Sequence, residues 1–215
     1  MKIGILGTGI VGQTIGSKLV QLGYDVKMGS RSANNEKATD WVNLNGSNAS
    51  NGTFQEAAYF GDILFNCTAG GASISALKLA NETNFNGKIL IDLANTLDFS
   101  KGMPPTLSIC NDDSLGEQIQ RTFPKLKVIK TLNTMNCKLM VDPALVNGDH
   151  DIFVCGNDLE AKEKVKSILS DWFGWKSILD LGDITAARGL EMLLPIWIRL
   201  MGIYKTPNFN FKIVR

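Results

Sequence analysis

Three glycines near the start of the chain have the spacing of a phosphate-binding turn. Gly7, Gly9 and Gly12 form the pattern GxGxxG in the segment GTGIVG. The first glycine of such a turn permits a tight bend, the second lets a pyrophosphate approach the backbone, and the third lets the following helix pack closely. The N-terminus of that helix then stabilises the phosphate charge. The segment predicts a dinucleotide site, and a purely structural glycine turn is the alternative.

The residues after the next strand-like run indicate which dinucleotide is bound. An NAD-selective site places Asp or Glu at this point to accept hydrogen bonds from the ribose 2′-hydroxyl. This chain has Ser30 and Arg31 instead, in the segment GSR, and Lys37 follows within reach. A guanidinium and an ammonium group both suit a 2′-phosphate. We therefore expect NADP(H) as the cofactor, and the alternative is that Arg31 is a solvated loop residue.

The elements that must position these residues follow from hydrophobic periodicity. The segments KIGIL, IVGQTIGSKLVQLG and YDVKM indicate a strand, a helix and a strand, and the same alternation continues into the C-terminal third. This rhythm predicts an α/β fold, a Rossmann-type doubly wound parallel sheet. We expect an NADP-binding domain over residues 1–150 and a small C-terminal α/β extension over residues 151–215 that packs on it.

Composition and charge argue against several classes of protein. A net charge of +1 offers no basic surface for nucleic acid, so no nucleic-acid partner is expected. No segment approaches the roughly eighteen uninterrupted apolar residues of a membrane span, so no membrane insertion is expected. Met1 is not followed by a signal-peptide pattern, which predicts a cytoplasmic protein. The four cysteines form no CxxC pair, so no metal site is expected.

The segments GTGIVGQTIGSKLVQLGYDVKMGSR, VCGNDLEAK and LDLGDITAARGLE together resemble the NADP oxidoreductases that use the deazaflavin coenzyme factor 420. The same segments are similar to the cytosolic reductase domains of membrane metalloreductases. The resemblance implies an enzyme, an NADPH-dependent oxidoreductase that passes hydride to a flavin or deazaflavin acceptor. A non-catalytic NADPH-binding or sensing module is the alternative, as is an electron-feeding domain that acts with a partner protein.

The resemblance also implies which residues contact the cofactor. Thr8 would join the residues at the 2′-phosphate and adenosine end, and Ile10 and Val11 would flank the pyrophosphate. Residues just past two later strands would line the crevice at the carboxyl edge of the sheet. The complete set of expected cofactor-binding residues is Gly7, Thr8, Gly9, Ile10, Val11, Gly12, Ser30, Arg31, Lys37, Thr68, Ala69, Ala94 and Asn95.

The segment TLNTMN would bring side chains over the nicotinamide and the second ring. At this position the family resemblance implies a histidine, and this chain has Asn133 instead. Asn133 would hydrogen-bond a ring carbonyl or carboxamide and Met135 would pack against a ring face, so both are expected to position the rings. Hydride transfer needs no protein acid or base when two rings are held face to face.

The remaining polar residues predict ordinary structural roles. His150, the only histidine, lies in the turn-rich segment NGDHD and is expected to be solvated. Arg188 and Glu191 lie three apart on a predicted helix and favour an intrahelical pair. That helix, over 184–201, is the most apolar of the chain. It packs on the sheet or forms a homodimer seam, and we expect a homodimer.

Overall fold

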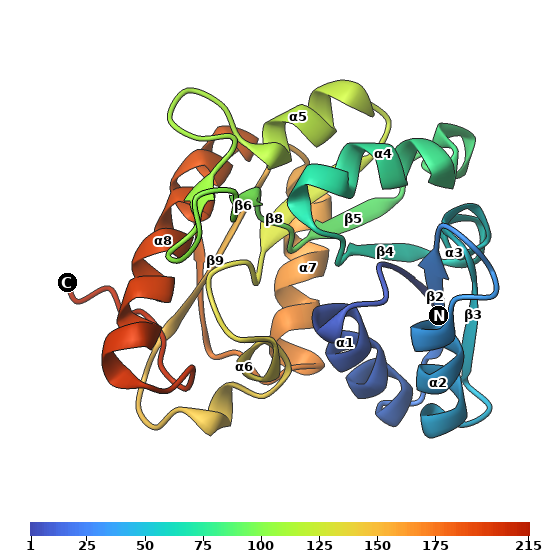
Figure 1. Cartoon of the computed structure of the whole chain (residues 1–215), viewed down its shortest axis with the longest axis horizontal. Coiled ribbons are helices and arrows are strands. Elements are labelled where there is room, and N and C mark those ends of the chain that lie inside the picture. Colours follow the sequence, from blue (N-terminus) through green and yellow to red (C-terminus); the bar gives the residue numbers. More distant parts are fainter.

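A mixed eight-stranded sheet forms the centre of the computed structural model, which describes residues 1–215 (Figure 1). Its strands stand in the order β10-β9-β8-β5-β4-β1-β2-β3. They are β1 (Lys2–Leu6), β2 (Asp25–Ser30), β3 (Ala49–Thr53), β4 (Ile63–Asn66), β5 (Ile89–Asp92), β8 (Lys127–Thr131), β9 (Asp151–Gly156) and β10 (Ser177–Asp180). The predicted Rossmann-type doubly wound α/β fold is confirmed, with the order of strands reversing beside β1.

One strand pair departs from the predicted parallel sheet. β9 runs antiparallel to β8, with Ile129 opposite Gly156, whereas β9 and β10 are parallel to each other. β9 begins on the same carboxyl edge of the sheet at which β8 ends, after the connecting segment over residues 132–150. A return of this kind needs no crossover helix and gives an antiparallel pair. The strands of the 151–215 segment therefore extend the same sheet.

Eight α-helices cover the two faces of the sheet (Figure 1). They are α1 (Ile10–Gln21), α2 (Glu36–Asn45), α3 (Phe54–Phe60), α4 (Gly70–Ala80), α5 (Leu115–Thr122), α6 (Cys137–Val141), α7 (Leu159–Asp171) and α8 (Ala187–Tyr204). One apolar core lies under α1, α2, α6 and α7, and a second lies under α3, α4, α5 and α8. Successive side chains of β1 point to opposite faces of the sheet, so Ile3 and Ile5 pack in the first core and Leu6 packs in the second.

The loop between β5 and α5 carries a short hairpin of its own. Its strands are β6 (Leu97–Asp98) and β7 (Thr106–Leu107), which pair antiparallel to each other outside the main sheet. None of the helices is both long enough and apolar enough to cross a membrane.

Candidate functional site

A cleft of about 530 Å³ opens at the point where the strand order reverses, between the carboxyl ends of β1 and β4. In open α/β sheets this is where ligands bind. Its walls come from the turn after β1, the end of β2, the start of α3 and the segment from the end of β4 into α4. The lining residues are Gly7, Thr8, Gly9, Arg31, Phe54, Cys67, Thr68, Ala69, Gly71, Ala72, Ser75, Ala76 and Leu79.

The glycine turn has the geometry that its sequence predicts. Gly7 has φ +123°, and a Cβ there would lie 2.5 Å from the Cys67 carbonyl oxygen. A Cβ on Gly12 would lie 2.3 Å from the carbonyl oxygen of Gly7, so only glycine lets α1 start this close to the strand. Gly9, by contrast, is exposed and has open space around its Cβ position. Open space at Gly9 leaves room for a ligand against the backbone.

The N-terminus of α1 faces this space with unsatisfied donors. Gly9 is the N-cap residue and has no side chain to accept a hydrogen bond from the first turn, in which Ile10 is exposed and Val11 half-buried. The first N–H groups of a helix have no intrahelical partner, and the helix dipole adds a partial positive charge. Together these groups can bind an anion such as a pyrophosphate.

The end of β2 supplies one free cation to the cleft. Arg31 is exposed, lines the cleft and takes part in no ion pair. Lys37 is exposed in the first turn of α2 but lies outside the residues that line the cleft. Ser30 is buried, and its hydroxyl donates to the carbonyl of Ser32 and accepts from the Ser32 N–H. Its proton therefore closes the turn instead of facing the cleft.

A buried polar network lies beneath the cleft at the carboxyl edge. Asn66 ends β4 and Asp92 ends β5, and the Asn66 side-chain amide donates to the Asp92 carboxylate over 2.7 Å. The Nζ of Lys130, in β8, lies 2.9 Å from Asp92 and 2.9 Å from Glu191 of α8, and it also donates to the Ala94 carbonyl. Ala94 itself is buried. This network links three neighbouring strands to the last helix.

The charges of this network stabilise one another. Burial alone would lower the pKa of Lys130, but Asp92 and Glu191 more than offset it, so the pKa lies above its ordinary value. Glu191 also accepts hydrogen bonds from the N–H groups of Leu115 and Gly116, at 2.9 and 3.0 Å. Those groups begin α5, where a carboxylate is favoured. Every charge in the network has a partner.

The expected pair between Arg188 and Glu191 is wrong. Glu191 faces Lys130, and Arg188 instead forms an ion pair with Glu117 of α5, with its Nε 2.9 Å from Oε2. This Arg188 hydrogen bond lowers the pKa of the Glu117 carboxyl. Both residues therefore connect α8 to α5. Each one bonds to groups on α5 across the interface between the two helices, and not to the other.

Asn133 and Met135 lie apart from the cleft lining. Asn133 is 2% exposed, and its amide donates to the Asn95 side chain and to the Leu190 carbonyl, at 2.9 and 3.1 Å. Asn95 returns a hydrogen bond to the Asn133 carbonyl over 2.9 Å, and Met135 is packed in the first apolar core. These contacts hold the loop over residues 132–136 against α8. The predicted role of Asn133 and Met135 beside the rings stays a prediction.

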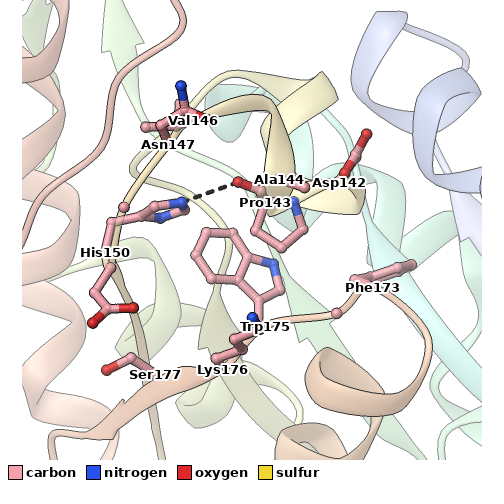
Figure 2. A pocket seen from close by; sticks show the side chains of 13 residues that line it. Asp142, Pro143, Ala144, Val146, Asn147, His150, Phe173, Trp175, Lys176 and Ser177 are labelled. Carbon is pink, nitrogen blue, oxygen red and sulfur yellow. Dashed lines mark hydrogen bonds between the residues drawn. The ribbon is translucent and has the colours of Figure 1, made fainter.

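A second hollow, of about 360 Å³, surrounds His150 and shares no lining residue with the cleft (Figure 2). The expectation of a solvated His150 is wrong. Its ring is half-buried, lies edge-on to Trp175 at 5.2 Å, and has Nε2 3.0 Å from the Pro143 carbonyl oxygen. Asn210 lies 2.9 Å from the other ring nitrogen. His150 thus joins the C-terminal segment to the start of β9.

The sequence analysis did not predict the buried polar network, although the sequence carries a signal for three of its residues. The strand-like runs ILFN and ILID are apolar except at their carboxyl ends, where Asn66 and Asp92 stand, and in KVIKT the apolar pair Val128 and Ile129 is followed by Lys130. A polar residue at the end of a buried parallel strand lies at the ligand-binding edge of the sheet. That pattern places the three residues near the cleft, but their partner on α8 has no local signal.

Comparison with known proteins identifies the family. A family model described as NADP oxidoreductase, coenzyme F420-dependent, matches residues 2–96. A crystal structure from Arthrobacter sp. FB24, provisionally described as an F420-dependent NADP reductase, is 51% identical, with a TM-score of 0.95 over 100% of both chains. The chain belongs to this family. It is an NADP-dependent oxidoreductase, which confirms the family resemblance and the cofactor class predicted from its motifs.

Two further relatives share the match. The chain is 29% identical over 160 residues to the F420-dependent NADP reductase of Methanocaldococcus jannaschii, covering 74% of this chain and 70% of the relative. It is 30% identical over 209 residues to the metalloreductase STEAP3 of Rattus norvegicus. That alignment covers 96% of this chain but only 38% of the metalloreductase.

Replacing Lys130 tests the importance of the buried network. Lys130→Met keeps the length of the side chain but leaves Asp92 and Glu191 as neighbouring buried carboxylates without their cation. We expect the free energy of unfolding to fall by about 3–5 kcal/mol in urea titrations. Lys164→Met, at an exposed position of α7, is the matched control and should change it by less than about 0.5 kcal/mol. A Lys130 variant as stable as the control would contradict the role of the network.

Proposed function

We propose that the cleft binds NADP(H) and that the chain transfers hydride between NADP(H) and a flavin or deazaflavin acceptor. The observation that supports this most directly is the glycine turn at the reversal of strand order, open at Gly9, with the unpaired Arg31 on the same cleft. A turn of this kind suits a pyrophosphate, and a guanidinium beside it suits a 2′-phosphate.

In this proposal different elements bind different parts of the cofactor. The backbone of Thr8, Ile10 and Val11 and the α1 N-terminus hold the pyrophosphate. Arg31 contacts the 2′-phosphate, with Lys37 adding its charge from α2. Ser30 acts by shaping the turn that presents Arg31, since its hydroxyl is bonded to Ser32.

The other half of the cofactor extends over β4 and β5. Thr68 and Ala69 line the cleft on that side, and Ala94 and Asn95 follow β5. Asn95 and Asn133 brace each other through two hydrogen bonds, and we propose that they and Met135 hold the edge against which the rings lie. NADPH supplies the hydride, and the protein contributes position and the exclusion of water.

Removing the cleft cation tests the 2′-phosphate assignment. Arg31→Ala should weaken NADPH binding at least tenfold and leave NADH binding nearly unchanged, because NADH lacks the 2′-phosphate. Isothermal titration with both cofactors measures the difference. Lys164→Ala, exposed on α7, is the control and should alter neither affinity. Equal losses for NADPH and NADH would refute the assignment.

The acceptor is tested by turnover. NADPH oxidation should be detectable by absorbance with at least one of flavin mononucleotide, flavin adenine dinucleotide and factor 420. The reason is that the proposed chemistry needs only a planar ring that can receive hydride against the nicotinamide. Tight NADPH binding with no oxidation by any of the three would overturn the proposed reaction.

A second candidate function follows from the metalloreductase relative. The chain aligns with 209 residues of STEAP3 but spans only 38% of that protein. The matching region of the relative is therefore one part of a longer chain. By analogy, this chain would bind NADPH and pass electrons to a partner protein, or sense NADPH by changing its association. Turnover with free flavin or deazaflavin acceptors separates the two candidates, because only the first candidate function requires it.

We also propose that residues 151–215 form the extension through which the protein makes a homodimer. Met192, Ile196, Ile203 and Tyr204 of α8 are 41%, 52%, 63% and 58% exposed, and an exposed apolar face of this kind suits an interface.

The homodimer is tested by a charge on the exposed face of α8. Ile196→Glu should convert a dimer to a monomer in sedimentation measurements, because a buried unpaired carboxylate is unfavourable. Leu44→Glu, at an exposed apolar position of α2, is the matched control and should leave the mass unchanged. A monomeric unaltered protein would contradict the homodimer.

A further inference from the structure

A chain of hydrogen bonds runs from the buried charges to the wall of the cleft. The Asn66 amide nitrogen donates to Asp92 over 2.7 Å and to the Ser73 hydroxyl over 3.1 Å. The Asn66 amide oxygen lies 2.7 Å from the Thr68 hydroxyl, which in turn lies 2.7 Å from Ser73. Asn66 and Ser73 are fully buried, and Thr68 lines the cleft. The direction of each bond determines what Thr68 can offer a ligand.

The Asp92 carboxylate sets the orientation of Asn66. An ionised carboxylate only accepts hydrogen bonds, and the Asp92 carboxylate forms an ion pair with Lys130. The NH₂ group of Asn66 must therefore face Asp92. Its carbonyl oxygen then faces Thr68, where it accepts from the backbone N–H and from the hydroxyl. The only proton of the Thr68 hydroxyl is committed to Asn66.

Ser73 sets the second contact of Thr68. The Ser73 oxygen already accepts the second Asn66 N–H, so its own proton points elsewhere. The Thr68 oxygen lies at 2.7 Å and the Ala69 carbonyl at 3.5 Å, and the shorter contact is the stronger hydrogen bond. A threonine hydroxyl has one proton and two lone pairs. Thr68 therefore has one lone pair left and no proton to give.

We propose that Thr68 is an acceptor-only contact that takes an N–H or O–H donor from the nicotinamide half of the cofactor, and that Ser73 is its positioning residue. This inference rests on the proposed NADP(H) site. Phosphate oxygens carry no proton to donate at neutral pH, which excludes them as partners of Thr68. Ribose hydroxyls and the carboxamide N–H remain as donors.

The strand order agrees with this assignment. β2, which ends just before Arg31, and β4, which ends two residues before Thr68, lie on opposite sides of β1. A cofactor with its pyrophosphate over the turn after β1 and its 2′-phosphate at Arg31 must extend its other half toward β4. The donors available at Thr68 are thus those of the nicotinamide and its ribose.

Binding titrations of Thr68 and Ser73 variants test the proposal. Thr68→Val should weaken NADP⁺ about three- to tenfold, the range of one neutral hydrogen bond, whereas Thr68→Ser should stay within about twofold of the unaltered protein. Neither variant should affect 2′,5′-ADP, which has the adenosine and 2′-phosphate but no nicotinamide half. Circular dichroism and the unfolding midpoint show whether each variant is folded.

Ser73→Ala distinguishes positioning from a general structural role. It should weaken NADP⁺ when Thr68 is present and have no further effect in the Thr68→Val background, because Ser73 acts through the Thr68 oxygen. The 3-acetylpyridine analogue of NADP⁺ lacks the carboxamide N–H and identifies the donor. If Thr68→Val weakens NADP⁺ but not the analogue, the donor is the carboxamide; equal weakening of both identifies a ribose hydroxyl.

Three results would overturn the proposal: no change in NADP⁺ affinity in Thr68→Val, an equal loss for 2′,5′-ADP, or a Ser73→Ala effect that persists without the Thr68 hydroxyl. Failure of the unaltered protein to bind either NADP⁺ or 2′,5′-ADP would instead overturn the proposed function on which the inference rests. That result is visible before any variant is made, so the two failures are distinguishable.

Discussion

The carboxyl edge of the sheet depends on the buried contacts that the ammonium group of Lys130 makes. This group is fully buried between Asp92 and Glu191 and also bonded to the Ala94 carbonyl. Two carboxylates without this cation could not share a dry site, because each buried charge needs a partner. Through these bonds one side chain holds β5, β8 and α8 together, and Glu191 extends the connection to the start of α5. The carboxyl edge is therefore one fixed assembly.

A fixed edge explains the division of work around the cleft. On its floor, the charge of Asp92 orients Asn66, and Asn66 in turn directs the Thr68 hydroxyl. Arg31, at its rim, and Lys37, outside the lining residues, are exposed and take part in no ion pair, so both can move toward the phosphate of the proposed cofactor. Groups that position a reacting ring gain from rigidity, whereas groups that neutralise a phosphate act at longer range. The family to which the chain belongs, that of NADP-dependent oxidoreductases, fits this arrangement.

Much of the fold was predictable because its signals are local. Strands such as KIGIL and helices such as the one after GTGIVG show their periods within a dozen residues, and their alternation implies a doubly wound sheet. The antiparallel direction of β9 carried no such signal, because a strand has the same pattern in either direction. The half-buried state of His150 was missed for a similar reason, since its partners Trp175 and Asn210 are distant in the chain.

The sequence by itself determined the glycine turn after the first strand and the cofactor class. Gly7 owes its role to backbone conformation and Gly12 to the close approach of the helix, and the lack of a carboxylate after β2 is likewise a local fact. Only the tertiary structure decided the partners of the charged side chains of α8: Glu191 with Lys130 and Arg188 with Glu117. The physical reason is that backbone geometry depends on neighbours in sequence, whereas a buried charge or hydroxyl bonds to whichever group packing brings within 3 Å or so.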